Sequence, residues 1–201
     1  MRVLITIGQQ LPFDRLIEGV DQLAVDYPDV EWIAQIGAGA YQPQHMKALT
    51  NVDQAAFDTL LSTSDMLICH AGIGTIMGAL TLGRPVLVMA RDAERGEHRN
   101  QHQQATLERL KDLPGVHPLG QVEDLAAVFS QVIAQLSDTQ TQAGQGGGQG
   151  FDIGGADPRL LAVVRTFIRG DDGSPVETSG TVETVETSGT VETVGTPGAA
   201  P

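Results

Sequence analysis

Two glycines stand where an apolar stretch gives way to a helical pattern, in the segment His70-Ala71-Gly72-Ile73-Gly74-Thr75. Glycine lets a ligand approach the main chain closely, and the first turn of a helix presents unpaired N–H groups and a favourable dipole to an anion. This combination suits a diphosphate. The pattern differs from the G-x-G-x-x-G of dinucleotide-binding proteins, because the next glycine is Gly78. A purely structural turn therefore stays open as the alternative.

A second group of polar residues lies between positions 91 and 103. It contains Arg91, Glu97, His98, Arg99, Asn100, His102 and Gln103. Guanidinium groups match phosphate oxygens, while carboxylate and amide groups suit sugar hydroxyls, so the segment is expected to form a polar ligand-binding wall. A solvated loop is the alternative. The two histidines are four residues apart beside a glutamate, but their order is not His-Glu-x-x-His and no further ligand cluster accompanies them, so no metal site is predicted.

Strands and helices alternate along residues 1–136, which are expected to form one domain. Strand patterns cover residues 2–7, 30–36, 65–70 and 85–90, with shorter ones near 46–52 and at 116–119. Helical periodicity covers residues 13–27, 55–61, 75–82, 101–111 and 123–136. This alternation predicts an α/β fold, a Rossmann-like parallel sheet with helices on both faces and right-handed crossovers.

Three loops follow predicted strands and define the candidate site. In open parallel sheets, ligands bind outside the carboxyl ends of the strands. The loops are Gly8-Gln9-Gln10, residues 70–75 and residues 91–103. We expect them to converge on one ligand.

Composition limits the possible partners. The chain has 201 residues and a formal charge of −13, and six of its 25 acidic residues but none of its 12 basic ones follow residue 170. This balance argues against binding nucleic acid or an anionic membrane surface directly. No apolar run reaches the about 20 residues of a membrane span, and residues 1–8 fit a buried strand better than a secretory signal. With Cys69 as the single cysteine, these features predict a cytoplasmic protein that would meet the inner face of a membrane through a partner.

The last third of the chain has a different character. Residues 137–150 are rich in Gln and Gly and are expected to be a flexible linker. Within residues 151–170, Asp157 and Pro158 fit the start of a helix that docks on the domain through an apolar side. That side carries Leu160, Leu161, Val164, Phe167 and Ile168. Residues 171–201 contain a duplicated nine-residue sequence and are expected to form a disordered acidic tail.

Four blocks that follow one another along residues 1–136 resemble a single family. They are Ile5-Thr6-Ile7-Gly8 with Pro12-Phe13-Asp14-Arg15-Leu16, then Cys69-His70-Ala71-Gly72-Ile73-Gly74-Thr75, then Leu82-Gly83-Arg84-Pro85 with Met89-Ala90-Arg91, and Gly96-Glu97-His98-Arg99-Asn100-Gln101-His102-Gln103. The chain is similar to the C-terminal, donor-binding domain of glycosyltransferase family 28, which is the C-terminal half of a GT-B architecture. It resembles most closely the stand-alone subunits of two-part enzymes, such as the eukaryotic dolichol-linked chitobiose synthase and bacterial exopolysaccharide glycosyltransferases.

The resemblance implies a hexosyltransferase that takes its sugar from a nucleoside-diphosphate sugar, with a UDP-sugar as the first expectation. This chain would be the donor-binding subunit and would need no cofactor. A membrane-anchored partner subunit would bind a lipid-linked or polysaccharide acceptor. By the same resemblance, the diphosphate would lie against Gly8, Gln9 and residues 72–75, the diphosphate or sugar would face Asn100, His102 and Gln103, and Arg91 and Glu97 would be nearby.

The catalytic base is not identified by the sequence. His70 and His102 are the candidates within the chain, and His70 fits a structural histidine at a strand end equally well. Many relatives carry a ribose-binding glutamate where this chain has Gly78, and Gln101 replaces the Asp of an Asn-Asp-His-Gln pattern in bacterial relatives. A second interpretation stays open, in which the chain is a non-catalytic regulatory or scaffolding subunit with a degraded nucleotide site. A third, a nucleotide-sugar epimerase of related architecture, is disfavoured because it needs two domains in one chain, for which 201 residues are too few.

Overall fold

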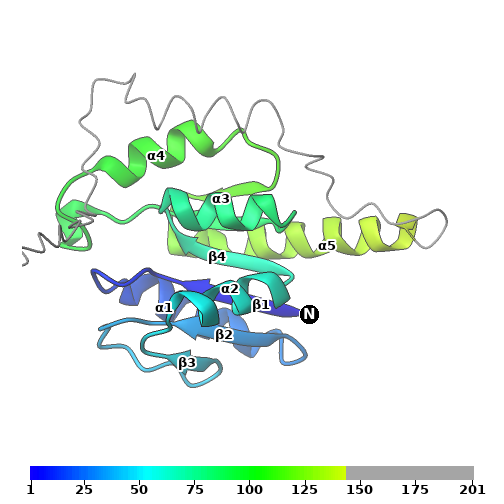
Figure 1. Ribbon diagram of the computed structural model, residues 1–201, viewed down its shortest axis with the longest axis horizontal. Coiled ribbons are helices and arrows are strands. Elements are labelled where there is room, and N and C mark those ends of the chain that lie inside the picture. Colours follow the sequence, from blue (N-terminus) through cyan, green and yellow to red (C-terminus); the bar gives the residue numbers. More distant parts are fainter. Residues whose placement is uncertain (144–201) are drawn as a thin grey trace, which may run out of the picture.

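The computed structural model describes residues 1–143, with side chains up to Asp138. Within these residues, a six-stranded sheet has the order β3-β2-β1-β4-β5-β6, and every neighbouring pair of strands is parallel (Figure 1). The strands are β1 (Arg2–Thr6), β2 (Glu31–Gln35), β3 (Lys47–Leu49), β4 (Met66–His70), β5 (Val86–Met89) and β6 (Val116–Leu119). The helices are α1 (Asp14–Val25), α2 (Gln54–Thr63), α3 (Ile73–Thr81), α4 (His102–Leu110) and α5 (Leu125–Ala143), with 3-10 turns η1 (Ala93–Arg95) and η2 (Val122–Asp124).

Helices cover both faces of the sheet. Val3 and Ile5 of β1 belong to the apolar core under α1 and α5, whereas Leu4 belongs to the core under α2, α3 and α4. All three side chains are fully buried. Because successive residues of a strand point to opposite faces, a strand buried on both sides must be apolar throughout. The near-continuous apolar runs in the sequence have this origin.

The predicted fold class is confirmed. Every strand and helix expected within residues 1–136 is present, and most of their ends differ from the prediction by a few residues. The largest difference is at α5, which continues from the expected end at Leu136 to Ala143. Gln, Thr and Ala are compatible with a helix, and the run of glycines begins only at Gly144. The division of the chain at residue 137 stays a prediction, and the expected helix within 151–170 and tail of 171–201 lie outside the described residues.

The strand order reverses its direction between β1 and β4. The chain moves outward from β1 through β2 to β3, then crosses to the other side of β1 to form β4, β5 and β6 (Figure 1). The loop after β1 leads into α1 on one face, while the loop after β4 leads into α3 on the other face. In open parallel sheets, ligands bind at such a topological switch point, outside the carboxyl ends of the strands.

Candidate functional site

The loops after β1 and β4 meet around His70, the last residue of β4. A Cβ atom on Gly8 would lie 3.0 Å from His70 Cε1, and one on Gly72 would lie 2.5 Å from His70 Nε2. The Cε1–Nε2 edge of the imidazole is therefore close to two glycines, one on each loop. Gly8 also has a φ of 74°, which favours glycine. The structure thus brings Gly8, His70 and Gly72 together at the switch point.

The first turn of α3 leaves its amide groups open. Gly72 is the N-cap residue and has no side chain to cap the helix. Ile76 N–H closes the first turn by donating to the Gly72 carbonyl at 3.1 Å, so the amides of Ile73, Gly74 and Thr75 precede the helical hydrogen-bond pattern. A Cβ on Gly74 would meet no other atom of the described chain within 4 Å. A helix start of this kind can receive an anion on its main-chain amides.

Two buried polar side chains hold the main chain of the β1 loop. Thr6 Oγ1 donates to Gln35 Oε1 at 2.8 Å, and Gln35 Nε2 donates to the Gly8 carbonyl at 2.9 Å. Thr6 and Gln35 are buried, so these contacts are shielded from water. Neither residue was among the predicted site residues. The signal in the sequence was a polar side chain at the same end of two otherwise apolar strands.

His70 is neutral at physiological pH. Burial lowers the pKa of its imidazole to about 4, and the positive charge of Arg91 lowers it further. A group with so low a pKa is a weak base near pH 7. His70 therefore fits a neutral residue that spaces the two loops better than it fits a general base.

Three predicted ligand residues of the 91–103 segment make contacts within the protein. Arg91 is 3% exposed, and its guanidinium donates to two main-chain carbonyls of the loop between β1 and α1. Gln103 is also buried and accepts the Arg91 N–H through Oε1 at 3.1 Å. Glu97 forms a two-pronged ion pair with Arg15, with both N–O distances at 2.9 Å. These contacts attach the segment to the loop after β1.

The remaining predicted residues are exposed. Asn100 and His102 lie at the start of α4, where Asn100 Oδ1 accepts the His102 N–H at 3.2 Å. Gln9 is exposed on the β1 loop, and its Nε2 donates to a main-chain carbonyl at 3.4 Å. Their side chains are therefore accessible to a ligand, whereas the side chain of Gln103 is buried.

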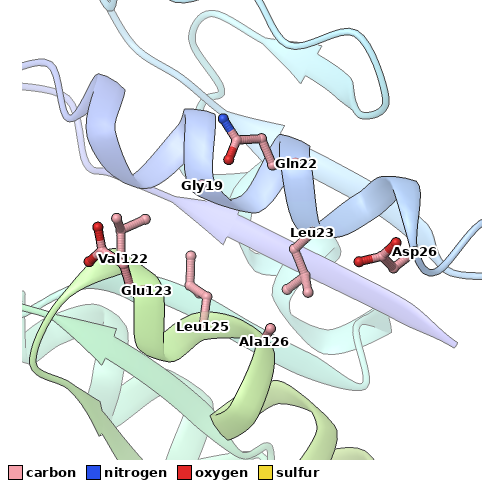
Figure 2. A pocket seen from close by; sticks show the side chains of 8 residues that line it. All are labelled: Gly19, Gln22, Leu23, Asp26, Val122, Glu123, Leu125 and Ala126. Atoms are coloured by element: carbon pink, nitrogen blue, oxygen red, sulfur yellow. The ribbon is translucent and has the colours of Figure 1, made fainter.

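A separate pocket of about 280 Å³ lies between α1 and the segment formed by η2 and α5 (Figure 2). Its lining residues are Gly19, Gln22, Leu23, Asp26, Val122, Glu123, Leu125 and Ala126. None of them is a predicted site residue. Across residues 1–143, no group of three or more His, Cys, Asp or Glu residues is placed to hold a metal ion, and no helix combines the length and apolar character needed to cross a membrane.

The strand order and the helices on both faces of the sheet define a doubly wound, Rossmann-like α/β domain. The model of the glycosyltransferase family 28 C-terminal domain matches residues 2–113. The chain therefore belongs to the glycosyltransferase family 28 C-terminal domain family, and the resemblance found in the sequence is confirmed. All the predicted site residues lie within the matched range.

Solved structures of similar fold share little sequence with the chain. The glycotransferase of kitacinnamycin has a TM-score of 0.54 and 19% identity, and the match covers 87% of this chain and 43% of that one. UDP-GlcNAc 2-epimerase from Neisseria meningitidis, bound to UDP-GlcNAc, has a TM-score of 0.50 and 18% identity, and the match covers 84% of this chain and 44% of that one. CalG4, the calicheamicin glycosyltransferase, has a TM-score of 0.50 and 16% identity, and the match covers 87% of this chain and 44% of that one. The chain spans less than half the length of each of these structures, whose likeness shows the fold alone. No curated protein sequence matches the chain.

Proposed function

We propose that this chain binds a nucleoside-diphosphate sugar and supplies the donor half of a glycosyltransferase active site. The observation that carries the proposal is the meeting of Gly8 and the open first turn of α3 at His70, at the carboxyl ends of β1 and β4. In a domain of glycosyltransferase family 28, an anion site built from main-chain amides fits the diphosphate of such a donor.

The proposed chemistry needs two contributions. Negative charge on the leaving diphosphate must be stabilised, and a base must remove the proton of the acceptor hydroxyl. The amides of residues 73–75 and the dipole of α3 would supply the first. Asn100 and His102, which are exposed, would contact the diphosphate or the sugar. Since the pKa of His70 is about 4, we assign the base to the acceptor-binding partner.

The donor and acceptor follow as narrower proposals. A UDP-sugar with a hexose-type sugar is the first donor to test, because one structure of similar fold is described as bound to UDP-GlcNAc. The acceptor would be lipid-linked or a polysaccharide, held at the cytoplasmic face by a membrane-anchored partner subunit. The family domain matched here is a C-terminal domain, and the chain spans less than half of two glycosyltransferases of similar fold. The acceptor-binding half of the active site would come from that partner.

A non-catalytic scaffolding subunit is the second candidate. Arg91, Glu97 and Gln103, which were predicted to be near the donor, are engaged in contacts within the protein. Gly78 offers no carboxylate to a ribose. In this case the fold would serve assembly with the partner, and the loops after β1 and β4 would bind no donor.

Thermal stabilisation separates the two candidates. A donor present at about 100 times its Kd should stabilise the folded protein by about 2.7 kcal/mol and raise its Tm, because it binds the folded state alone. The donors to test are UDP-GlcNAc, UDP-glucose and GDP-mannose, with and without the partner subunit. A rise with one of them supports the donor-binding proposal. No rise with any of them in the presence of the partner favours the scaffold.

The variants Asn100→Ala and His102→Ala are expected to weaken donor binding by about tenfold each, because each removes a hydrogen-bonding group from the ligand-facing start of α4. Isothermal titration calorimetry with the donor that gives the largest rise in Tm measures the effect. Gln101→Ala is the matched control, since Gln101 is exposed between the two residues. Affinities equal to the control, with the fold intact by circular dichroism, would remove both residues from the site.

A further inference from the structure

The guanidinium group of Arg91 lies buried beneath the loop that follows β1. Its Nη2 donates to the main-chain carbonyls of Ile7 and Leu11, which flank the Gly8-Gln9-Gln10 turn. Its carbon Cζ lies 5.5 Å from the centre of the Phe13 ring, which is fully buried. One side chain just after β5 therefore contacts both ends of a turn that lies 80 to 84 residues away in sequence.

The charge of this arginine is costly to bury, so its placement needs an explanation. Burial lowers the pKa of Arg91, and the negative charge of Glu97 opposes the change. Both Glu97 carboxylate oxygens are already bonded to Arg15, and one also accepts the Asp92 N–H at 2.9 Å. Arg91 thus directs Nη2 to two carbonyl oxygens and not to a carboxylate, while its buried Nε has no hydrogen-bond partner among the described residues. A buried guanidinium is tolerated where its hydrogen bonds have a specific geometry to maintain.

A second contact ties the same two segments together. Arg15, in the first turn of α1, and Glu97, in the loop before α4, are 22% and 12% exposed in their side chains. In the sequence, Arg15 follows the Gly8-Gln9-Gln10 turn, whereas β1 precedes it. The loop after β5 is therefore joined to the β1 loop at Ile7 and Leu11, and to the helix that follows this loop at Arg15.

We propose that Arg91 is a positioning residue that clamps the Gly8-Gln9-Gln10 turn through the carbonyls of Ile7 and Leu11. The clamp holds the turn in the conformation that receives the diphosphate and couples it to the segment carrying Asn100 and His102. The ligand in this inference rests on the proposed function, whereas the clamp itself rests on the contacts of Arg91. Arg91 thereby acts through the loop and does not touch the donor.

Two variants and one matched control test the clamp. Arg91→Met keeps the length of the side chain but removes both donations, and Arg91→Lys keeps the charge but replaces the fork with one ammonium group. Arg84→Met is the control. Arg84 precedes the opposite end of β5, where its Nη2 also faces a carbonyl oxygen, that of Ser62, at 3.4 Å. Each protein is examined without ligand by hydrogen–deuterium exchange, and then by titration with inorganic pyrophosphate, UDP and GDP.

In Arg91→Met, the peptide covering residues 8–11 should exchange about tenfold faster or more, because two hydrogen bonds from a charged group are lost. Binding of the probe that the wild type binds should weaken by about tenfold or more. Arg91→Lys should show smaller changes than Arg91→Met in both exchange and probe binding. If both variants keep the Tm of the wild type, a general loss of stability cannot explain these changes. Arg84→Met should leave exchange in this peptide and binding as in the wild type.

Wild-type exchange at residues 8–11 in both Arg91 variants would overturn the inference, as would faster exchange with unchanged probe affinity. If Arg91→Met does not fold, Arg91→Lys decides: faster exchange at residues 8–11 supports the clamp and wild-type exchange overturns it. A wild-type protein that binds none of the three probes contradicts the proposed function. The exchange experiment then still decides whether Arg91 clamps the turn.

Discussion

Asp21→Ala is expected to lower the free energy of unfolding by about 3 kcal/mol. Asp21 lies on the buried side of α1 and is 2% exposed. Its carboxylate accepts the Tyr41 hydroxyl at 2.9 Å, the Gln44 N–H at 2.9 Å and the His45 N–H at 2.8 Å. These bonds tie the loop between β2 and β3 to α1. Alanine would leave three donors without their acceptor, and urea unfolding monitored by circular dichroism measures the loss.

The loss should depend on pH. Burial by itself would raise the pKa of Asp21, but the hydrogen bonds from Gln44, His45 and Tyr41 outweigh it and hold the pKa below its ordinary value of 3.8. A carboxyl group with a depressed folded-state pKa stabilises the protein above its unfolded pKa, and this contribution is lost as the pH falls through the folded pKa. The difference in unfolding free energy between wild type and Asp21→Ala should therefore be largest above about pH 5 and shrink below pH 3.8.

Asp14→Ala is the control for this prediction. Asp14 is on the same helix and accepts one N–H of the same loop, that of Ala40, at 3.1 Å in an exposed position. Its loss should cost about 1 kcal/mol or less. Equal losses for the two variants, or an Asp21 difference that stays constant from pH 7 to pH 3, would contradict the assigned role of Asp21.

Gly72→Ala should reduce donor affinity by more than about tenfold, because the added methyl group overpacks this position and distorts the proposed binding site. The new Cβ would lie 2.5 Å from His70 Nε2 and 2.9 Å from His70 Cε1. The same edge of the ring is also close to Gly8, where a Cβ would lie 3.0 Å from His70 Cε1. The change must therefore move the imidazole, the start of α3 or the β1 loop. Calorimetry with the donor identified by thermal stabilisation measures the effect.

A double-mutant cycle assigns the effect to the imidazole. His70→Ala removes the ring, so the double variant His70→Ala/Gly72→Ala should bind better than Gly72→Ala alone. Gly74→Ala shows what an added methyl group does to folding alone, since a Cβ on Gly74 meets no atom of the described chain within 4 Å. The free energy of unfolding of this variant should equal that of the wild type or be up to about 1 kcal/mol higher. Wild-type affinity of Gly72→Ala, or additive effects in the cycle, would show that His70 does not set the spacing of the loops.

The order of elements could be predicted because parallel strands and amphipathic helices have different apolar periods. The strand ending at His70 and the helix beginning after Gly72 were both visible in this way. Their placement beside Gly8 was expected from the rule that ligands bind at the carboxyl ends of strands. The strand order itself depends on contacts between distant segments, and the structure alone shows that β1 and β4 are neighbours.

The roles of several polar side chains could not be predicted. A buried arginine and a phosphate-binding arginine look the same in a sequence, so Arg91 was placed with the ligand residues. Its contacts with Ile7 and Leu11 join residues far apart in the chain. Asp21 carried a local signal, because it stands among buried residues on the apolar side of α1. The hydrogen-bond donors that stabilise a carboxylate at this position lie in the loop between β2 and β3. Hydrophobic periodicity does not predict the path of a loop.

Chemical-shift mapping tests the central claim most directly. The assigned amide spectrum of the protein, titrated with UDP, should show its largest changes at Gly8, Gln9 and residues 72–75, with smaller ones at the start of α4. These amides lie in the loops that follow β1 and β4 and at the start of α3 and α4. Changes confined to the pocket between α1 and α5, or no changes with UDP, GDP or their sugar conjugates in the presence of the partner, would contradict a donor site at this switch point.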